Sequence, residues 1–181
     1  LVTAAALLAS VGAASSQSEA ERFNAWLEET WEEQLAFDPI LATAIGDDRY
    51  NGQLPNFTTA AHRAEADAMN DRWLRELEKF DRKKLVGQDR LSWDIMKSDL
   101  EQVERGARFP DWMQPINQFG SLPSFLAQMG SGSSIQPFRS TRDYDDWLAR
   151  MRVVPALFDG TIANLRRGLE EGVTQPRPIM E

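Results

Sequence analysis

The feature that most constrains this chain is an apolar stripe that runs through residues 141–172. Its members recur at steps of three and four residues, which places them on one side of a helix, and the other side is almost wholly polar. Thr141 is a favourable N-cap, and Gly172 can end the helix in a left-handed conformation. The pattern predicts a long amphipathic helix that forms one wall of a hydrophobic core. Its inward side chains would be Tyr144, Trp147, Leu148, Met151, Val154, Phe158, Ile162, Leu165 and Leu169.

A proline interrupts this stripe. Pro155 removes one backbone hydrogen bond and clashes with the preceding turn, which costs roughly 3 kcal/mol inside a regular helix. The stripe nevertheless keeps its phase from Met151 through Val154 to Phe158. We therefore expect either one kinked helix or two helices in near-continuation.

Four further segments show helical spacing of apolar residues, and short turns join most of them. Together they predict an all-α fold, an antiparallel helical array with one long irregular loop rich in proline and glycine over residues 108–140. In the second long helix, Ala61, Ala64 and Ala68 are expected to face inward and to let a neighbouring helix approach closely. The predicted helices are residues 19–37, 40–45, 58–80 and 88–105.

Charge and cysteine content exclude several classes of function. The chain of 181 residues carries 28 acidic and 20 basic side chains, a formal net charge of −8. This balance argues against DNA, RNA or an anionic membrane as a partner, because each needs a clustered basic surface. The absence of cysteine excludes disulfides, a thiolate nucleophile and a thiolate zinc site.

The N-terminal residues are typical of an export signal. Residues 1–16 combine a short apolar run of small residues with a serine-rich polar end, as in the later part of a secretory signal peptide. The alternative is an ordinary buried helix of alanine and leucine. The chain has no initiator methionine and ends just after a proline-marked turn. We therefore expect residues 17–181 to be the N-terminal helical part of a larger domain, in an exported protein of the periplasm or the extracellular space.

Two charged groups are candidates for chemistry, and each has a simpler interpretation. Asp47 and Asp48 beside Arg49 could bind a ligand, but a bidentate ion pair that ties down the loop is the commoner arrangement. His62 is the only histidine, and without a second histidine or carboxylate four residues away it forms no zinc site by itself. We expect it to be an exposed histidine on the face of a helix.

The best candidate for a ligand-facing surface is the irregular segment 108–140. Long irregular segments with many apolar side chains are uncommon unless they are packed or functional. Within this one, Asn117 and Gln118 offer amide groups of the kind that orient a substrate backbone, which makes them candidates for a substrate cleft. The alternative is that both amides satisfy the backbone of their own loop. The apolar anchors of the loop would be Trp112, Met113, Ile116 and Phe119.

Four stretches, in order, resemble the N-terminal part of the bacterial family catalogued as domain of unknown function 885. No single motif is diagnostic, but the ordered set covers the chain from Phe37 to its last residue. The stretches are Phe37-Asp38-Pro39 with residues 42–50 (ATAIGDDRY), residues 89–94 (DRLSWD), residues 114–120 (QPINQFG), and Tyr144 with Trp147-Leu148-Ala149-Arg150 leading to residues 162–168 (IANLRRG).

The resemblance implies a zinc-dependent peptidase. The family is mostly helical, often exported and grouped with zincin-like metallopeptidases, and its His-Glu motif and further histidines lie in the C-terminal half. It thus implies a peptide substrate, with zinc ligands and a general-base glutamate downstream of this sequence. No catalytic or metal-binding residue can be assigned within the 181 residues. The alternative is a non-catalytic exported helical module that binds a peptide or an envelope partner.

Overall fold

The computed structural model describes residues 17–117 and 120–180, with the side chains of the last two left aside. Within these residues every regular element is helical, apart from one isolated pair of bridged residues, so the all-α prediction is confirmed. The elements are α1 (Glu19–Phe37), α2 (Pro39–Ala44), the 3-10 turn η1 (Asp48–Tyr50), α3 (Ala60–Leu77), α4 (Gly87–Gly106), the 3-10 turn η2 (Asp111–Met113), α5 (Leu122–Met129), α6 (Thr141–Met151), α7 (Val154–Glu171) and α8 (Arg177–Met180). The predicted signal segment, residues 1–16, and the candidate Gln118 lie outside the described residues.

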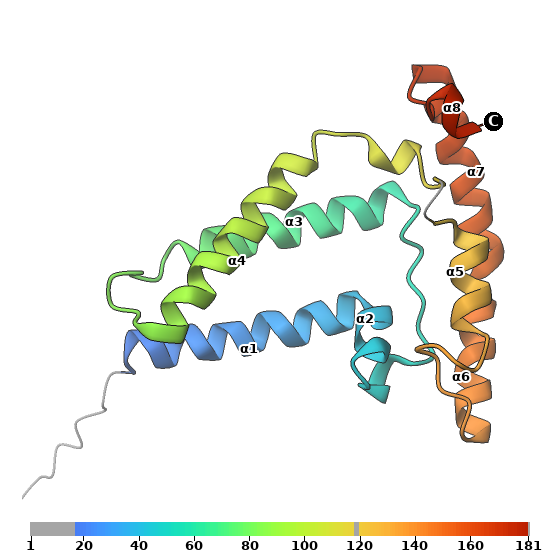
Figure 1. The fold of residues 1–181 in the computed structure, drawn as a ribbon. Coiled ribbons are helices and arrows are strands. Elements are labelled where there is room, and N and C mark those ends of the chain that lie inside the picture. Colours follow the sequence, from blue (N-terminus) through green and yellow to red (C-terminus); the bar gives the residue numbers. More distant parts are fainter. Residues whose placement is uncertain (1–16, 118–119, 181) are drawn as a thin grey trace, which may run out of the picture.

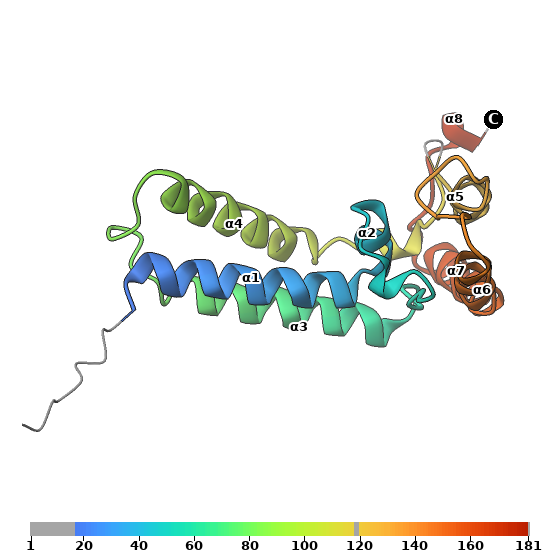
Figure 2. The ribbon, with the colours of Figure 1, turned by 90° about the horizontal axis from the view of Figure 1, so that it is seen from below.

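Helices α1, α3 and α4 form the first part of the molecule. Figures 1 and 2 show them side by side, each running opposite to the next along the chain. A capping box in which Ser18 and Glu21 bind each other's backbone N–H starts α1. Large apolar side chains fill the space between the three helices. The buried members of this three-helix core are Phe23, Trp26, Trp73, Leu77, Leu85 and Leu100.

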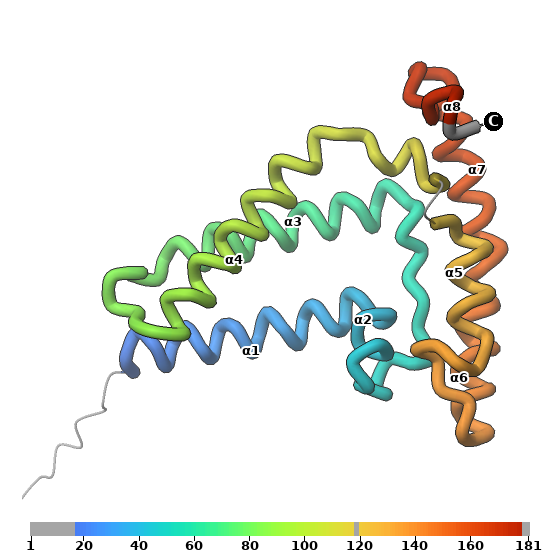
Figure 3. The backbone as a smooth tube through the Cα atoms, viewed as in Figure 1, coloured from blue at the N-terminus to red at the C-terminus, as the bar shows by residue number. Residues whose placement is uncertain are grey.

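The second part consists of α5, α6 and α7, which stand across the end of the three-helix part (Figure 1). Residues 51–59 form an extended connection that runs beside this second part before α3 begins (Figure 3). The apolar core of the second part contains Leu54, Leu122, Leu126, Met129 and Leu157. Among the described helices, none is both long and apolar enough to cross a membrane.

The predicted helix over residues 141–172 is two helices. The break falls at Arg152 and Val153, and Pro155 sits in the first turn of α7, where a proline costs no intrahelical hydrogen bond. Gly172 ends α7 with φ 74°, the left-handed cap that the sequence predicts. The two helices follow each other in near-continuation, the second of the two expected arrangements.

The face that these helices bury differs from the prediction. Tyr144, Leu148, Ile162 and Leu169 are 55%, 54%, 44% and 70% exposed, so much of the large apolar stripe faces outward. The buried residues of α7 are instead Leu157, Thr161 and Gly168. A second stripe, shifted by one residue and made of smaller side chains, is the one that α7 buries.

Small residues are buried here because other segments approach the backbone of α7 closely. A Cβ at Gly160 would lie 1.9 Å from Thr58 Oγ1, and a Cβ at Gly168 would lie 2.8 Å from the carbonyl oxygen of Met113. Only glycine fits at such distances, so these two positions bring residues 51–59 and η2 against α7. A hydrophobic stripe of larger side chains could not take this face.

Three other sequence predictions need correction. Ala61, Ala64 and Ala68 are exposed, because α3 packs through its later residues Asn70, Trp73 and Leu77. On α4 only Leu100 is fully buried, and the expected inward residue Val103 is 52% exposed. The segment 108–140 is less irregular than expected, because Ser121 caps the eight-residue helix α5 within it.

A fully buried arginine on α6 binds α2, the segment that follows α2 and the segment that precedes α6. Arg150 is 0% exposed. Its Nε donates to the carbonyl of Gln53 (2.9 Å), one terminal nitrogen to Gln136 Oε1 (2.5 Å), and the other to Thr43 Oγ1 (2.6 Å) and to the carbonyl oxygens of Pro39 and Tyr50 (3.0 and 3.3 Å). Burial lowers the pKa of Arg150 to about 10, so the guanidinium keeps its charge at neutral pH. Oxygen atoms of uncharged groups therefore solvate a buried cation.

Candidate functional site

A hollow of about 380 Å³ lies where the irregular segment meets α5, α7 and the extended connection. We call it the loop cleft. It brings the predicted ligand-facing segment together with the extended connection before α3 and with α7, which lie far from it on either side along the chain. Its lining residues are Phe57, Thr58, Trp112, Pro115, Asn117, Gly120, Ser121, Leu122, Phe125, Thr161 and Asn164.

Asn117 stands at the rim of the loop cleft, in a tight antiparallel turn with Gly120. The two residues exchange backbone hydrogen bonds of 3.1 and 3.3 Å. The side-chain oxygen of Asn117 also accepts from the N–H of Gly120 at 3.1 Å. This bond matches the alternative in which the amide supports its own loop, while the residue remains exposed and lines the cleft. A role of Asn117 toward a substrate stays a prediction.

The wall opposite Asn117 is held in place through one carbonyl group. The oxygen of Thr58 accepts from Arg63 Nη1 at 2.8 Å and from Asn164 Nδ2 at 3.0 Å. The guanidinium of Arg63 also stacks over the ring of Trp112, 4.3 Å from its centroid. Arg63 thus joins the start of α3 to η2, and it fixes Thr58 and Trp112 on adjoining sides of the cleft.

The part of the irregular segment around Gln114 and Ile116 is held in place by Gln175, which follows α7. Gln175 Nε2 donates to Gln114 Oε1 at 3.0 Å and to the carbonyl oxygen of Ile116 at 3.2 Å. Met113 is 5% exposed, and its carbonyl rests against Gly168 of α7. Met113 is therefore the anchor that the sequence predicts, whereas Ile116 is 37% exposed.

The loop cleft is uncharged. Among the described residues that line it, none carries a formal charge; they offer hydroxyl and amide groups beside aromatic rings. Such a lining suits neutral polar groups, of which a peptide backbone is one, and it provides hydrogen bonds without a nucleophile of raised reactivity. The arrangement can bind and orient, and no bond-making step follows from it.

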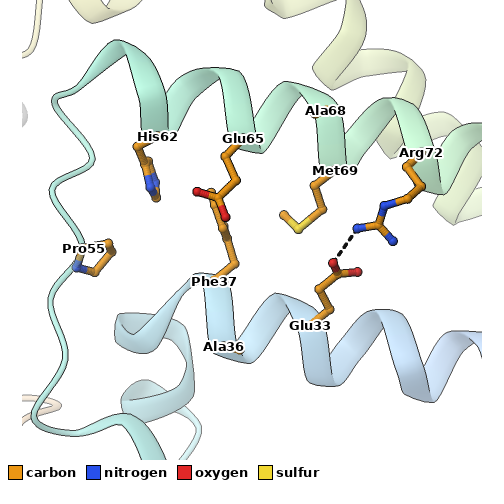
Figure 4. Close-up of a pocket in the computed structure, with 9 residues that line it drawn as sticks. All are labelled: Glu33, Ala36, Phe37, Pro55, His62, Glu65, Ala68, Met69 and Arg72. Atoms are coloured by element: carbon orange, nitrogen blue, oxygen red, sulfur yellow. Dashed lines mark hydrogen bonds and ion pairs between the residues drawn. The ribbon is translucent and has the colours of Figure 1, made fainter.

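A second hollow, of about 510 Å³, lies between α1 and α3 and contains His62. Figure 4 shows His62 and Glu65 projecting from α3 toward Phe37 of α1. The imidazole stacks on the Phe37 ring with centroids 4.5 Å apart and planes 9° apart. The prediction of an exposed histidine is therefore wrong in part, because this contact half-buries the ring.

The carboxylate at the other end of this hollow has partners already. Glu33 accepts from Arg72 and from Trp73 Nε1, the latter at 2.9 Å. Partial burial raises the pKa of Glu33, but the hydrogen bonds from Arg72 and Trp73 outweigh it and leave the pKa below the usual carboxylate range. Within residues 17–117 and 120–180, no three histidine, cysteine, aspartate or glutamate side chains gather in a way that could hold a metal ion. The residues present do not fit a zinc ion.

Several residues of the four resembling stretches have structural partners. Arg150 of the fourth stretch binds Pro39, Thr43 and Tyr50 of the first. Arg49 forms the predicted bidentate pair with Asp47, with Nε–Oδ1 and Nη2–Oδ2 distances of 3.0 and 2.6 Å, and these bonds hold the pKa of Asp47 below its usual value.

The family that these stretches resemble is also the one found by comparison with known families. A family model described as "Bacterial protein of unknown function (DUF885)" matches residues 39–181. The chain belongs to the DUF885 family. Neither the curated proteins nor the solved structures contain a match to it. In this DUF885 member, the first and fourth of the resembling stretches meet at Arg150 and form one polar core.

Sequence reasoning had missed Arg150 and the small-residue face of α7. The signal was present, because Leu157, Thr161, Asn164 and Gly168 also recur at helical spacing. Hydrophobicity favoured the neighbouring stripe, and only the close approach of other segments shows which face is covered.

Proposed function

We propose that this DUF885 chain is the N-terminal helical part of an exported, zinc-dependent, peptidase-like hydrolase, and that it forms one wall of the substrate cleft. The zinc ligands and the general base would lie downstream of these 181 residues. Residues 1–16 would direct export. The reaction class is the one that the sequence resemblance described above implies, and the uncharged loop cleft supports a peptide as the ligand.

The observation that carries the proposal is the composition of the loop cleft. A peptide backbone offers neutral donors and acceptors at regular intervals, and a lining of amides, hydroxyls and aromatic rings matches it without burying charge. In this role the chain binds and orients the substrate, while the bond is broken by groups supplied elsewhere. Asn117, and Gln118 beside it, would contact the substrate backbone.

The test uses the full-length protein encoded by the parent gene. Zinc is measured by elemental analysis, and turnover is measured on a library of unstructured peptides. We expect about one zinc ion per chain. The double variant Asn117→Ala/Gln118→Ala should lower kcat/KM several-fold to tenfold, because each lost hydrogen bond to a neutral group is worth about 0.5–1.5 kcal/mol.

Gln102→Ala is the matched control, because it removes an exposed amide on α4, away from the loop cleft. It should leave turnover unchanged. Unchanged turnover in the Asn117/Gln118 double variant, with normal folding, would show that these residues do not contact the substrate. A protein without zinc that still binds peptides would support the non-catalytic binding module instead.

A further inference from the structure

The exposed face of α6 and α7 has the spacing of a coiled-coil seam. Its residues recur at alternating steps of four and three, which are the steps between positions d and a of a heptad repeat. Four of them, Tyr144, Leu148, Ile162 and Leu169, are between 44% and 70% exposed. We call this set the apolar ridge; it consists of Tyr144, Leu148, Met151, Pro155, Phe158, Ile162, Leu165 and Leu169, of which Met151 and Phe158 are partly buried and also pack against the core of their own chain.

A line of charged side chains borders the apolar ridge. Asp145, Arg152, Asp159 and Arg166 follow one another at seven-residue steps, each directly after a d-type position, so they occupy position e of every heptad. All four are exposed, and their signs alternate along the line. In the part of the chain that the structure describes, none of them forms an ion pair, whereas Arg167 beside them pairs with Glu171.

This charge pattern is complementary to itself under a two-fold rotation. With an antiparallel second copy and an axis at the peptide bond that follows Pro155, Asp145 would face Arg166 of the other copy and Arg152 would face Asp159 of the other copy. The rotation repeats both pairs, so four pairs of opposite charge result. A shift by one heptad would instead set Arg152 against Arg166 and Asp159 against Asp159. The pattern therefore specifies one register.

The other border of the ridge excludes a parallel pair. In a parallel coiled coil the e positions of one helix face the g positions of the other, whereas in an antiparallel one e faces e. Here Thr161 and Gly168 at position g are buried, and Trp147 and Val154 pack against the apolar core of their own chain. Only the e border is open to a partner.

We propose that the apolar ridge is the interface for a second copy of this chain, bound as an antiparallel two-fold dimer. The ridge runs from Tyr144 to Leu169, about 38 Å at the helical rise of 1.5 Å per residue. In Figures 1 and 2, α6 and α7 lie at the edge of the molecule beyond the three-helix part, where a second copy has room. The same patch serves both copies, as a two-fold interface requires. This inference is independent of the peptidase proposal.

The test exploits the charges of the border. The purified full-length protein is studied by analytical ultracentrifugation over a wide concentration range. The wild type should show a monomer–dimer equilibrium. Asp145→Arg and Arg166→Asp each place like charges at both ends of the ridge. Each should weaken the dimer on the order of tenfold, because two attractive pairs become repulsive.

The decisive measurement is the mixture of these two variants. In a heterodimer of Asp145→Arg with Arg166→Asp, each changed residue faces an opposite charge, so mixing should restore dimers that neither variant forms well alone. A folding defect or a change within one chain gives no such recovery. Arg167→Asp is the control, because Arg167 occupies position f of the heptad, which points away from the seam, and its substitution should leave the equilibrium unchanged.

Two outcomes would overturn the proposal. One is a mixture that stays as monomeric as its components. The other is a wild type that sediments as a monomer at every concentration, with Leu148 and Leu169 protected from solvent labelling, which would show that another segment of the same protein covers the ridge. Circular dichroism of each variant confirms that its helices have formed.

Discussion

The two parts of the molecule are each stabilised by a different kind of interaction. Between α1, α3 and α4, large side chains such as Phe23 and Leu77 fill the space, and the charged groups pair near the surface. Around α6 and α7, other segments approach the helix backbone closely at glycines, and a charged group, Arg150, occupies a buried position.

The two parts should differ in how much stability they lose on conservative substitution. An apolar core requires volume, and side chains of similar size can exchange with modest loss. A core built on one guanidinium and on close backbone approach requires particular atoms at particular places, because a buried polar group left without a partner costs about 1–3 kcal/mol. The second part should therefore be the more sensitive to conservative substitutions.

The largest effect is expected at Arg150. Arg150→Lys keeps the charge but cannot span the oxygen atoms of Gln53, Gln136 and Pro39, so we expect a loss of about 3–5 kcal/mol in the free energy of unfolding. Leu77→Met in the three-helix core should cost less than about 1.5 kcal/mol. Urea denaturation measures both. Arg142→Lys, an exposed change on α6, is the control. Equal costs at Arg150 and Leu77 would erase the contrast between the two parts.

A smaller effect is expected at Gly160. Gly160→Ala places a Cβ 1.9 Å from Thr58 Oγ1, so it should destabilise the protein by about 1–3 kcal/mol through overpacking. Gly106→Ala in α4 meets nothing within 4 Å, and it should stabilise by up to about 1 kcal/mol.

Adding Thr58→Ala to Gly160→Ala should recover part of the loss. A double-mutant cycle, measured by thermal or urea unfolding, gives the coupling energy. Additive effects of the two substitutions would mean that α7 and Thr58 do not touch as closely as the structure indicates.

The smallest effect is expected at the surface of the three-helix part. Arg82 donates two hydrogen bonds to Asp94, at 2.5 and 2.6 Å, and these hold the pKa of Asp94 below its usual value. A carboxyl whose pKa is lower in the folded state stabilises the protein above its unfolded pKa and loses that contribution as the pH falls through the folded value. Asp94→Asn should therefore lower the urea midpoint slightly at pH 7 and have a smaller effect near pH 3.

Asp67→Asn, at an exposed carboxylate on α3, is the control for this pH dependence. It should give the same small effect at both pH values. A difference between pH 7 and pH 3 as large for Asp67→Asn as for Asp94→Asn would show that the Arg82–Asp94 pair does not contribute.

The sequence predicted those elements whose signals are local. The bounds of α1 match the predicted residues 19–37, Asp38 caps α2, and Gly172 ends α7 in the left-handed conformation. The Arg49–Asp47 pair was also predictable, because its two members are two residues apart. For the candidate site, the sequence indicated the segment around Asn117 but not the opposite wall at Thr58 and Asn164, which comes from distant parts of the chain.

The sequence by itself determined most of the long helices to within a few residues and that the fold is all-α, because caps, prolines and helical periodicity act within a few residues. Tertiary structure decided which face of each helix is covered. On α7 two stripes compete, and Gly160 and Gly168 let Thr58 and the backbone of η2 approach the smaller one, so much of the larger stripe stays outside. Such a choice depends on contacts between segments as far apart as Thr58 and Gly160, and no local pattern encodes those distances.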